Sequence, residues 1–190
     1  MPRITLIGYR GSGKSAVAAH LAARWGCSWQ DADDVLEREV GESIAALVAA
    51  HGEGWFRDLE STLLDRLLGE ESGVLATGGG VILREANRAA LRANGRPVVW
   101  LMASADVLRA RLAADPATAT RRPSLSGTNP LDEVAAALIA RAPFYRAVAD
   151  AVIDVSVEPA ERIAERIAAW LDGSAPHGPD PCDPAGEAIP

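Results

Sequence analysis

Residues 8–15 constrain this chain more than any other stretch. They read Gly8-Tyr9-Arg10-Gly11-Ser12-Gly13-Lys14-Ser15 and match the phosphate-binding pattern G-x-x-x-x-G-K-[ST] at every defined position. The apolar run 4–7 before them indicates a buried strand, and the run 16–23 after them indicates a helix. A strand, a glycine-rich loop and a helix in this order predict a phosphate loop on an α/β fold.

The loop residues predict how a nucleotide is bound. The glycines allow successive backbone N–H groups to point at phosphate oxygens, so we expect Gly11, Ser12 and Gly13 to bind ATP. Lys14 is expected to reach the β- and γ-phosphates, and the Ser15 hydroxyl to bind Mg²⁺. Lys14 is the only lysine in a chain with 19 Lys+Arg residues, and we expect it at an exposed loop position.

The bulk composition limits the class of protein. A chain of 190 residues that is 48% hydrophobic fits one globular domain. A net charge of −7 argues against a nucleic-acid binder. No apolar run approaches the roughly 20 residues that cross a bilayer, and the first strand leaves no room for a signal peptide. Two cysteines make no disulfide framework, so we expect a cytoplasmic protein. We also expect the protein to be a monomer.

Strands alternate with helices along the chain. Apolar runs predict the five strands at 4–7, 27–30, 74–77, 97–102 and 151–155. This alternation predicts an α/β fold in which helices cover both faces of a five-stranded parallel sheet, in three layers. The phosphate loop, residues 31–33 and residues 78–80 each follow a strand. Because ligands bind beyond the carboxyl ends of such strands, we expect these segments to meet at one edge.

Two aspartates follow the second strand at alternate positions. Of Asp31 and Asp33, one could hold Mg²⁺ through water while the other accepts a proton from a substrate hydroxyl. The alternative is that both only stabilise the start of a helix.

Several further groups suggest an acceptor site. Arg57 and Glu60 lie three residues apart on a predicted helix, where an arginine oriented by a carboxylate could clamp a substrate carboxylate. The alternative is a surface salt bridge. Glycines 78–80 would allow close approach of the backbone to a ligand. Arg121 and Arg122 lie in the loop 115–129, which lacks apolar periodicity and could close over the γ-phosphate.

The ordered set of motifs resembles the shikimate kinase family. After the phosphate loop come D-x-D (31–33), F-R-x-x-E (56–60), G-G-G (78–80), R-P (122–123) and R-A-P-x-Y-R (141–146), in the family's order. The resemblance covers residues 3 to about 172. It implies a phosphate-loop kinase, related in fold to nucleoside monophosphate kinases, that transfers the γ-phosphoryl group of ATP to the 3-hydroxyl of shikimate.

The resemblance also implies roles for individual residues. Asp33 resembles the residue that binds and activates the shikimate hydroxyl. Arg57, oriented by Glu60, and Arg141 resemble a clamp on the shikimate carboxylate. Gly79 and Gly80 resemble the glycines that contact the same substrate.

Other implied roles concern the nucleotide and the moving parts. Arg122 resembles the lid arginine that reaches the phosphates, and Arg111 the arginine that lies against adenine. Asp31 resembles the partner that holds one Mg²⁺ ion through water. The lid would be about residues 114–127 and the substrate-binding subdomain about 33–60. Residues 1–172 would form a single domain, and the Gly- and Pro-rich residues 173–190 a disordered tail.

Two departures and two competing functions stay open. Ala16 stands where many members have a second hydroxyl residue, so its contact to the α-phosphate would come from the backbone N–H alone. Ser124 stands where the lid often has leucine. A gluconate kinase or nucleoside monophosphate kinase could use the same scaffold, although paired arginines and Asp33 favour a carboxylate acceptor. A nucleotide-binding regulatory module is disfavoured because Asp33 and Arg122 are both present.

Overall fold

The computed structural model describes residues 1–114 and 133–173 of the chain. Its strands are β1 (Ile4–Ile7), β2 (Trp29–Asp31), β3 (Val74–Ala76), β4 (Val98–Met102) and β5 (Ala151–Asp154). Its helices are α1 (Lys14–Trp25), α2 (Ala32–Val40), α3 (Ile44–Gly69), the short 3₁₀ helix η1 (Val81–Leu83), α4 (Glu85–Asn94), α5 (Ala105–Ala114), α7 (Glu133–Val148) and α8 (Ala160–Leu171).

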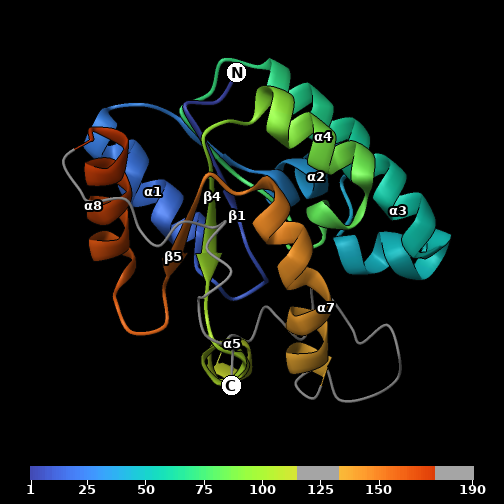
Figure 1. The fold of residues 1–190 in the computed structure, drawn as a ribbon. Helices are drawn as coiled ribbons and strands as arrows, with labels where there is room; N and C mark the ends of the chain where they lie inside the picture. Colours follow the sequence, from blue (N-terminus) through green and yellow to red (C-terminus); the bar gives the residue numbers. More distant parts are fainter. Residues whose placement is uncertain (115–132, 174–190) are drawn as a thin grey trace.

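The strands form one parallel sheet in the order β2-β3-β1-β4-β5 (Figure 1), which confirms the predicted five-stranded parallel sheet. β1 lies at the centre, between β3 and β4. The strand order reverses there, because β2 and β3 lie to one side of β1, and β4 and β5 to the other. Ligands of such sheets bind beyond the carboxyl end of the strand where the order reverses, and the phosphate loop leaves β1 at that point.

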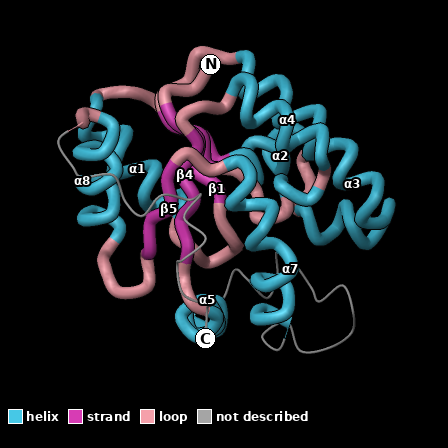
Figure 2. Tube along the Cα trace, viewed as in Figure 1, coloured by secondary structure: helices cyan, strands magenta, loops and turns pink. Residues whose placement is uncertain are grey.

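Alternate residues of each strand point to opposite faces of the sheet, and helices bury both faces. In β4, Leu101 belongs to the core beneath α1 and α8, whereas Trp100 belongs to the core beneath α2, α3 and α4. Figure 2 shows these two groups of helices on opposite sides of the strands. The predicted three-layer arrangement is therefore confirmed.

Helix α7 contributes to both cores. Near its start, Val134 packs in the core that contains α1 and α8. Near its end, Tyr145 and Val148 pack in the opposite core, against α4 and β4. The helix contains Pro143 and continues through it to Val148. The start of α7 therefore reaches the core beneath α1 and α8, whereas its later residues pack on the opposite face of the sheet.

The second strand begins later than predicted. The prediction was 27–30, whereas β2 runs from Trp29 to Asp31 and pairs Asp31 with Ala76 of β3. The N–H of Cys27 donates to the carbonyl of Ala22 and completes the end of α1, so this residue is not available for the sheet. The shift makes Asp31 the last residue of the strand as well as the residue that caps α2.

Helix α3 is broken at Gly52. Gly52 has a φ of 85° and a ψ of 163°, which are not helical, and it divides α3 into a short first part and a long second part. The sequence analysis did not predict η1, which follows the glycine turn 78–80 directly.

Part of the predicted organisation lies outside the described residues. This holds for Arg121, Arg122, Ser124 and almost all of the lid proposed at about 114–127. It also holds for the proposed tail beyond residue 173. Among residues 1–114 and 133–173, no helix is long and apolar enough to span a membrane.

Candidate active site

The phosphate loop has a backbone shape that requires glycine. Gly8, Gly11 and Gly13 have φ values of 147°, 79° and 86°. A Cβ atom at Gly8 would lie 2.6 Å from the carbonyl oxygen of Leu101, so no larger residue fits there. Helix α1 starts at Lys14, immediately after the loop. Its first N–H groups and its positive dipole end lie beyond the carboxyl end of β1, where an anion binds favourably.

Lys14 lies over its own loop. Its Nζ donates hydrogen bonds to the carbonyl oxygens of Gly8 at 2.9 Å and Tyr9 at 3.1 Å. Only 8% of Lys14 is exposed, so the expectation of an exposed loop position is wrong. The hydrogen bonds to these two carbonyl oxygens place the ammonium group of Lys14 within the loop.

Ser15 and Asp31 meet between α1 and β2. The Ser15 hydroxyl donates to Oδ2 of Asp31, and Oδ1 of Asp31 accepts from the backbone N–H of Asp33 at 2.9 Å. Asp31 is therefore the N-cap of α2. Burial raises the pKa of Asp31 above its ordinary value, and the bond from Ser15 opposes that rise.

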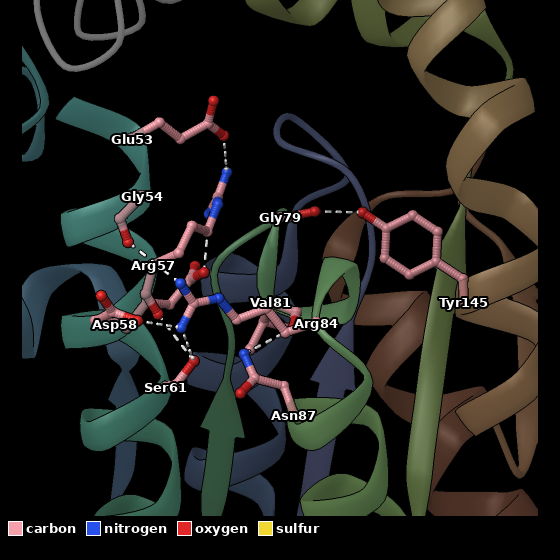
Figure 3. A network of polar contacts seen from close by, with 11 residues as sticks. Glu53, Gly54, Arg57, Asp58, Ser61, Gly79, Val81, Arg84, Asn87 and Tyr145 are labelled. Atoms are coloured by element: carbon pink, nitrogen blue, oxygen red, sulfur yellow. Dashed lines mark hydrogen bonds and ion pairs between the residues drawn. The ribbon is translucent and has the colours of Figure 1, made fainter.

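The guanidinium of Arg57 is held by two carboxylates of its own helix (Figure 3). Nη1 donates to Glu60 at 2.8 Å, and Nη2 donates to Glu53 at 2.9 Å. The Arg57 side chain is 11% exposed and that of Glu60 is 6% exposed, so this pair is not a surface salt bridge. Burial acts to lower the pKa of Arg57, but Glu60 and then Glu53 outweigh it and raise the pKa. The charged form of Arg57 is thus stabilised at the site.

The glycine turn 78–80 packs between the charged groups and the phosphate loop. A Cβ atom at Gly80 would lie 2.4 Å from Nη1 of Arg57. One at Gly78 would lie 2.7 Å from a carboxylate oxygen of Asp33 and equally close to one of Glu60. One at Gly79 would lie 3.0 Å from the backbone nitrogen of Arg10 in the phosphate loop. Without side chains, this turn brings Asp33, Arg57 and the phosphate loop together.

Tyr145 anchors the same turn from α7. Its hydroxyl donates to the carbonyl oxygen of Gly79 at 2.6 Å, and the residue is fully buried (Figure 3). Its ring stacks on Trp100 of β4, with ring centroids 5.4 Å apart. Burial raises the pKa of Tyr145, while the nearby positive charge of Arg141 acts in the opposite direction. The hydroxyl is therefore a stable donor at neutral pH.

The two remaining predicted arginines differ in their surroundings. Arg141 lies on α7, and its guanidinium carbon is 5.3 Å from the centre of the Tyr9 ring. Arg111, on α5, donates to the carbonyl of Val155 at 2.6 Å and to that of Gly11 at 3.4 Å. Arg111 therefore lies on the far side of the phosphate loop from the Arg57 network, beside the end of β5.

Two contributors were missed by the sequence analysis. Glu53 lies four residues before Arg57, the spacing that brings side chains together on a helix. Tyr145 lies four residues after Arg141, within the motif R-A-P-x-Y-R, so its position could have been noticed. The hydrogen bond from Tyr145 to Gly79 could not be predicted from the sequence, because these two residues are 66 positions apart. Among the described residues, no group of three His, Cys, Asp or Glu side chains could hold a metal by itself.

The chain matches known proteins over most of its length. A family model described as shikimate kinase matches residues 10–172. The shikimate kinase of Rhodopirellula baltica is 48% identical over 151 residues, which are 80% of each chain. That of Oleidesulfovibrio alaskensis is 43% identical over 164 residues, 86% of this chain and 94% of its own.

Solved structures agree with the sequence matches. Shikimate kinase from Acinetobacter baumannii in complex with shikimate superposes with a TM-score of 0.84 at 34% identity, covering 91% of this chain and 94% of its own. Shikimate kinase from Aquifex aeolicus gives a TM-score of 0.75 at 30% identity, covering 91% of this chain and 97% of its own.

Proposed function

The chain belongs to the shikimate kinase family, and we propose that it transfers the γ-phosphoryl group of ATP to the 3-hydroxyl of shikimate. The products are shikimate 3-phosphate and ADP, in the biosynthesis of aromatic amino acids. The observation that carries this proposal is the buried Arg57, oriented by Glu60 and packed on the glycine turn that touches the phosphate loop. A fixed cation beside a phosphate site suits an acceptor with a carboxylate.

On the nucleotide side, the phosphate loop binds the phosphates of ATP through backbone N–H groups. These come from Gly11, Ser12, Gly13 and Ala16, and Lys14 stabilises the charge on the transferred group. Arg111 already lies against the carbonyl of Gly11, which supports a place beside the nucleotide. Arg122, in the lid at about 114–127, approaches the phosphates when the lid closes.

On the acceptor side, Arg57 and Arg141 bind the carboxylate of shikimate. Glu60 orients Arg57, and Gly79 and Gly80 contact the ring of the acceptor. Asp33 hydrogen-bonds the 3-hydroxyl and accepts its proton as the oxygen attacks the γ-phosphorus. The closeness of Asp33 and Glu60 to Gly78 supports this arrangement, since it puts the proposed base and the proposed clamp on the same turn.

The residues beside the loop fit one Mg²⁺ ion. The Ser15 hydroxyl and the Asp31 carboxylate are oxygen donors in hydrogen-bonding contact, and oxygen donors are what Mg²⁺ prefers. Burial raises the pKa of Asp31, which means that a nearby cation would stabilise its charged form. Ser15 would hold the ion directly and Asp31 through water. When bound, Mg²⁺ would supply positive charge that offsets the charge developing on the phosphates during transfer.

We further propose a cytoplasmic monomer that has ATP and shikimate as its small-molecule partners and binds neither nucleic acid nor membranes. Residues 1–172 form its single domain, with a substrate-binding subdomain at about 33–60. The break in α3 at Gly52 lies inside this subdomain.

The function is tested by ADP release with four candidate acceptors. Shikimate, gluconate, AMP and CMP are compared at equal concentration with ATP and Mg²⁺. We expect shikimate to be the preferred acceptor, with a kcat/KM at least about a hundredfold above that of gluconate, AMP or CMP. The reason is that charge-assisted contacts distinguish the acceptors. Preferred turnover of gluconate, AMP or CMP would overturn the proposal.

A further inference from the structure

Tyr9, the second residue of the phosphate loop, touches both halves of the site. Its carbonyl oxygen accepts hydrogen bonds from Nζ of Lys14 at 3.1 Å and from the backbone N–H of Ser12 at 3.2 Å. Only 6% of the residue is exposed. Its ring lies beneath the guanidinium of Arg141, 5.3 Å from ring centre to guanidinium carbon. The phosphate pattern leaves this position open, so its residue type is not required for nucleotide binding.

The contact is of a kind that holds an arginine in place. A guanidinium within about 6 Å of an aromatic ring centre is attracted by the ring, and more strongly when water is excluded. An arginine side chain is long and flexible, so a group that restricts it lowers the entropy lost when a ligand binds. Tyr9 is buried and its backbone is anchored by Lys14, so the ring is a rigid support.

The helix that carries Arg141 is anchored independently. Tyr145, one turn further along α7, is bonded through its hydroxyl to the carbonyl of Gly79. The backbone of α7 is thus held to the glycine turn, while the end of the Arg141 side chain rests on the phosphate loop. The Tyr145 hydroxyl also interacts with Arg141, so removing the Tyr9 ring would take away one of two supports of the guanidinium and leave the helix in place.

We propose that Tyr9 is a positioning residue of the acceptor site. Its ring holds the guanidinium of Arg141 where it meets the carboxylate of the acceptor, so a residue of the nucleotide loop sets the affinity for the other substrate. The inference rests on the proposed function, because that function assigns Arg141 to the acceptor.

The test compares two substitutions of the same residue. Tyr9→Phe keeps the ring and should leave both Michaelis constants within about twofold of the wild type. Tyr9→Leu removes the ring and should raise the KM for shikimate about three- to thirtyfold, with the KM for ATP unchanged. Tyr9→Met supplies a second ring-free variant if Tyr9→Leu does not fold. A rise in the KM for ATP alone, or equal effects of Phe and Leu, would overturn the inference.

A double-mutant cycle then asks whether Tyr9 acts through Arg141. In an Arg141→Ala background, Tyr9→Leu should raise the KM for shikimate no further, because the group that it supports is absent. Additive effects would mean that Tyr9 acts by another route, and would overturn the inference.

The same measurements separate failure of the inference from failure of the proposed function. If the wild type phosphorylates shikimate and Arg141→Ala raises its KM, while Tyr9→Leu does not, only the inference fails. If Arg141→Ala leaves that KM unchanged, the proposed role of Arg141 fails and the inference with it. If the wild type does not turn over shikimate, the proposed function itself fails, and the inference falls with it.

Discussion

The proposed nucleotide half and the proposed acceptor half of the site are built by different means. The phosphate loop is one continuous stretch, and its shape depends on backbone conformations that glycine adopts at residues 8, 11 and 13. The acceptor half is assembled from α2, α3, the turn 78–80 and α7, and side-chain contacts join them. A continuous backbone motif tolerates few residue types at defined positions. An assembly of side chains instead depends on residues that lie far apart in the sequence.

From this difference we expect substitutions in the two halves to have different effects on kinetics and stability. Apart from Tyr9, substitutions in the nucleotide half should affect the transfer step while sparing acceptor affinity. Substitution of Asp33 should affect turnover, whereas substitutions of the acceptor-half arginines should affect the KM for shikimate and, where the contact is buried, stability as well. The predictions below run from variants that should lose most of their turnover, through one with weaker acceptor affinity, to one that should chiefly lose stability.

Lys14→Ala should abolish most turnover. Loss of a preorganised cation that stabilises developing charge typically lowers kcat by about 10²–10³-fold. The carbonyls of Gly8 and Tyr9 also lose their donor, so we expect unfolding free energy to fall by about 1–3 kcal/mol. Steady-state kinetics and thermal melting measure the two effects. Arg24→Ala, at the exposed end of the same helix, is the control and should change neither; near-normal turnover of a folded Lys14→Ala protein would contradict the assigned role.

Asp33→Asn should lower turnover by roughly 10²–10⁴-fold and leave ATP binding intact, because an amide still hydrogen-bonds the hydroxyl but accepts no proton. Single-turnover kinetics and ATP titration measure this. Asp34→Asn on the same turn is the matched control. A drop of less than about tenfold would mean that Asp33 only positions the hydroxyl, with the proton transferred late or to phosphate.

Arg57→Lys should raise the KM for shikimate about ten- to a hundredfold and leave the KM for ATP unchanged. Lysine keeps the charge but loses the fork that binds a carboxylate through two parallel bonds, worth about 1.5–3 kcal/mol. Helix α3 offers a matched control in Arg66, which also bonds two glutamates, Glu39 and Glu70, but whose side chain is 46% exposed. Arg66→Lys should change neither constant. A weaker affinity for ATP instead would place Arg57 in the nucleotide half.

Tyr145→Phe should have the smallest effect on catalysis and a clear effect on stability. The ring stays stacked on Trp100, but the buried carbonyl of Gly79 loses its donor, at a cost of about 1–3 kcal/mol. Chemical denaturation measures the loss. The control is Thr62→Val, which removes a similar hydroxyl-to-carbonyl bond at an exposed position of α3 and should be neutral. Equal stability of the two variants would show that burial of the Tyr145 bond adds nothing.

The sequence was sufficient for the parts of the molecule that depend on local pattern. Continuous apolar runs predicted the strands, and their alternation with helices predicted the layers, because burial on two faces leaves a continuous apolar signal. The phosphate loop was predictable because its glycines, its lysine and its serine are adjacent in the chain. The start of β2 was misplaced because the end of α1 uses the N–H of Cys27, a contact that composition does not reveal.

The contacts across the chain were not predictable in the same way. The burial of Lys14 depends on two carbonyls whose direction follows from loop dihedrals. The bond from Tyr145 to Gly79 depends on how α7 packs on β4, which is a property of the assembled core. Motif order pointed to Arg57 and Glu60, but only the three-dimensional arrangement shows that they are buried against Gly80. The roles of these residues toward substrates remain predictions.

The path of α7 from one core to the other has a consequence for the order in which the protein matures during synthesis. Residues 1–77 contain the phosphate loop and the three adjacent strands β2, β3 and β1, so a nascent chain of that length already holds the parts of the nucleotide half. Arg141 and Tyr145 leave the ribosome about 65 residues later. Tyr145 and Val148 then fill the core beneath α2, α3 and α4, while the core beneath α1 stays incomplete until β5 and α8 follow. Domains form as the chain emerges from its N-terminus. A truncated or stalled product would therefore carry a nucleotide loop without an acceptor clamp and with apolar surface open on both faces of the sheet, a species that quality-control proteases would recognise.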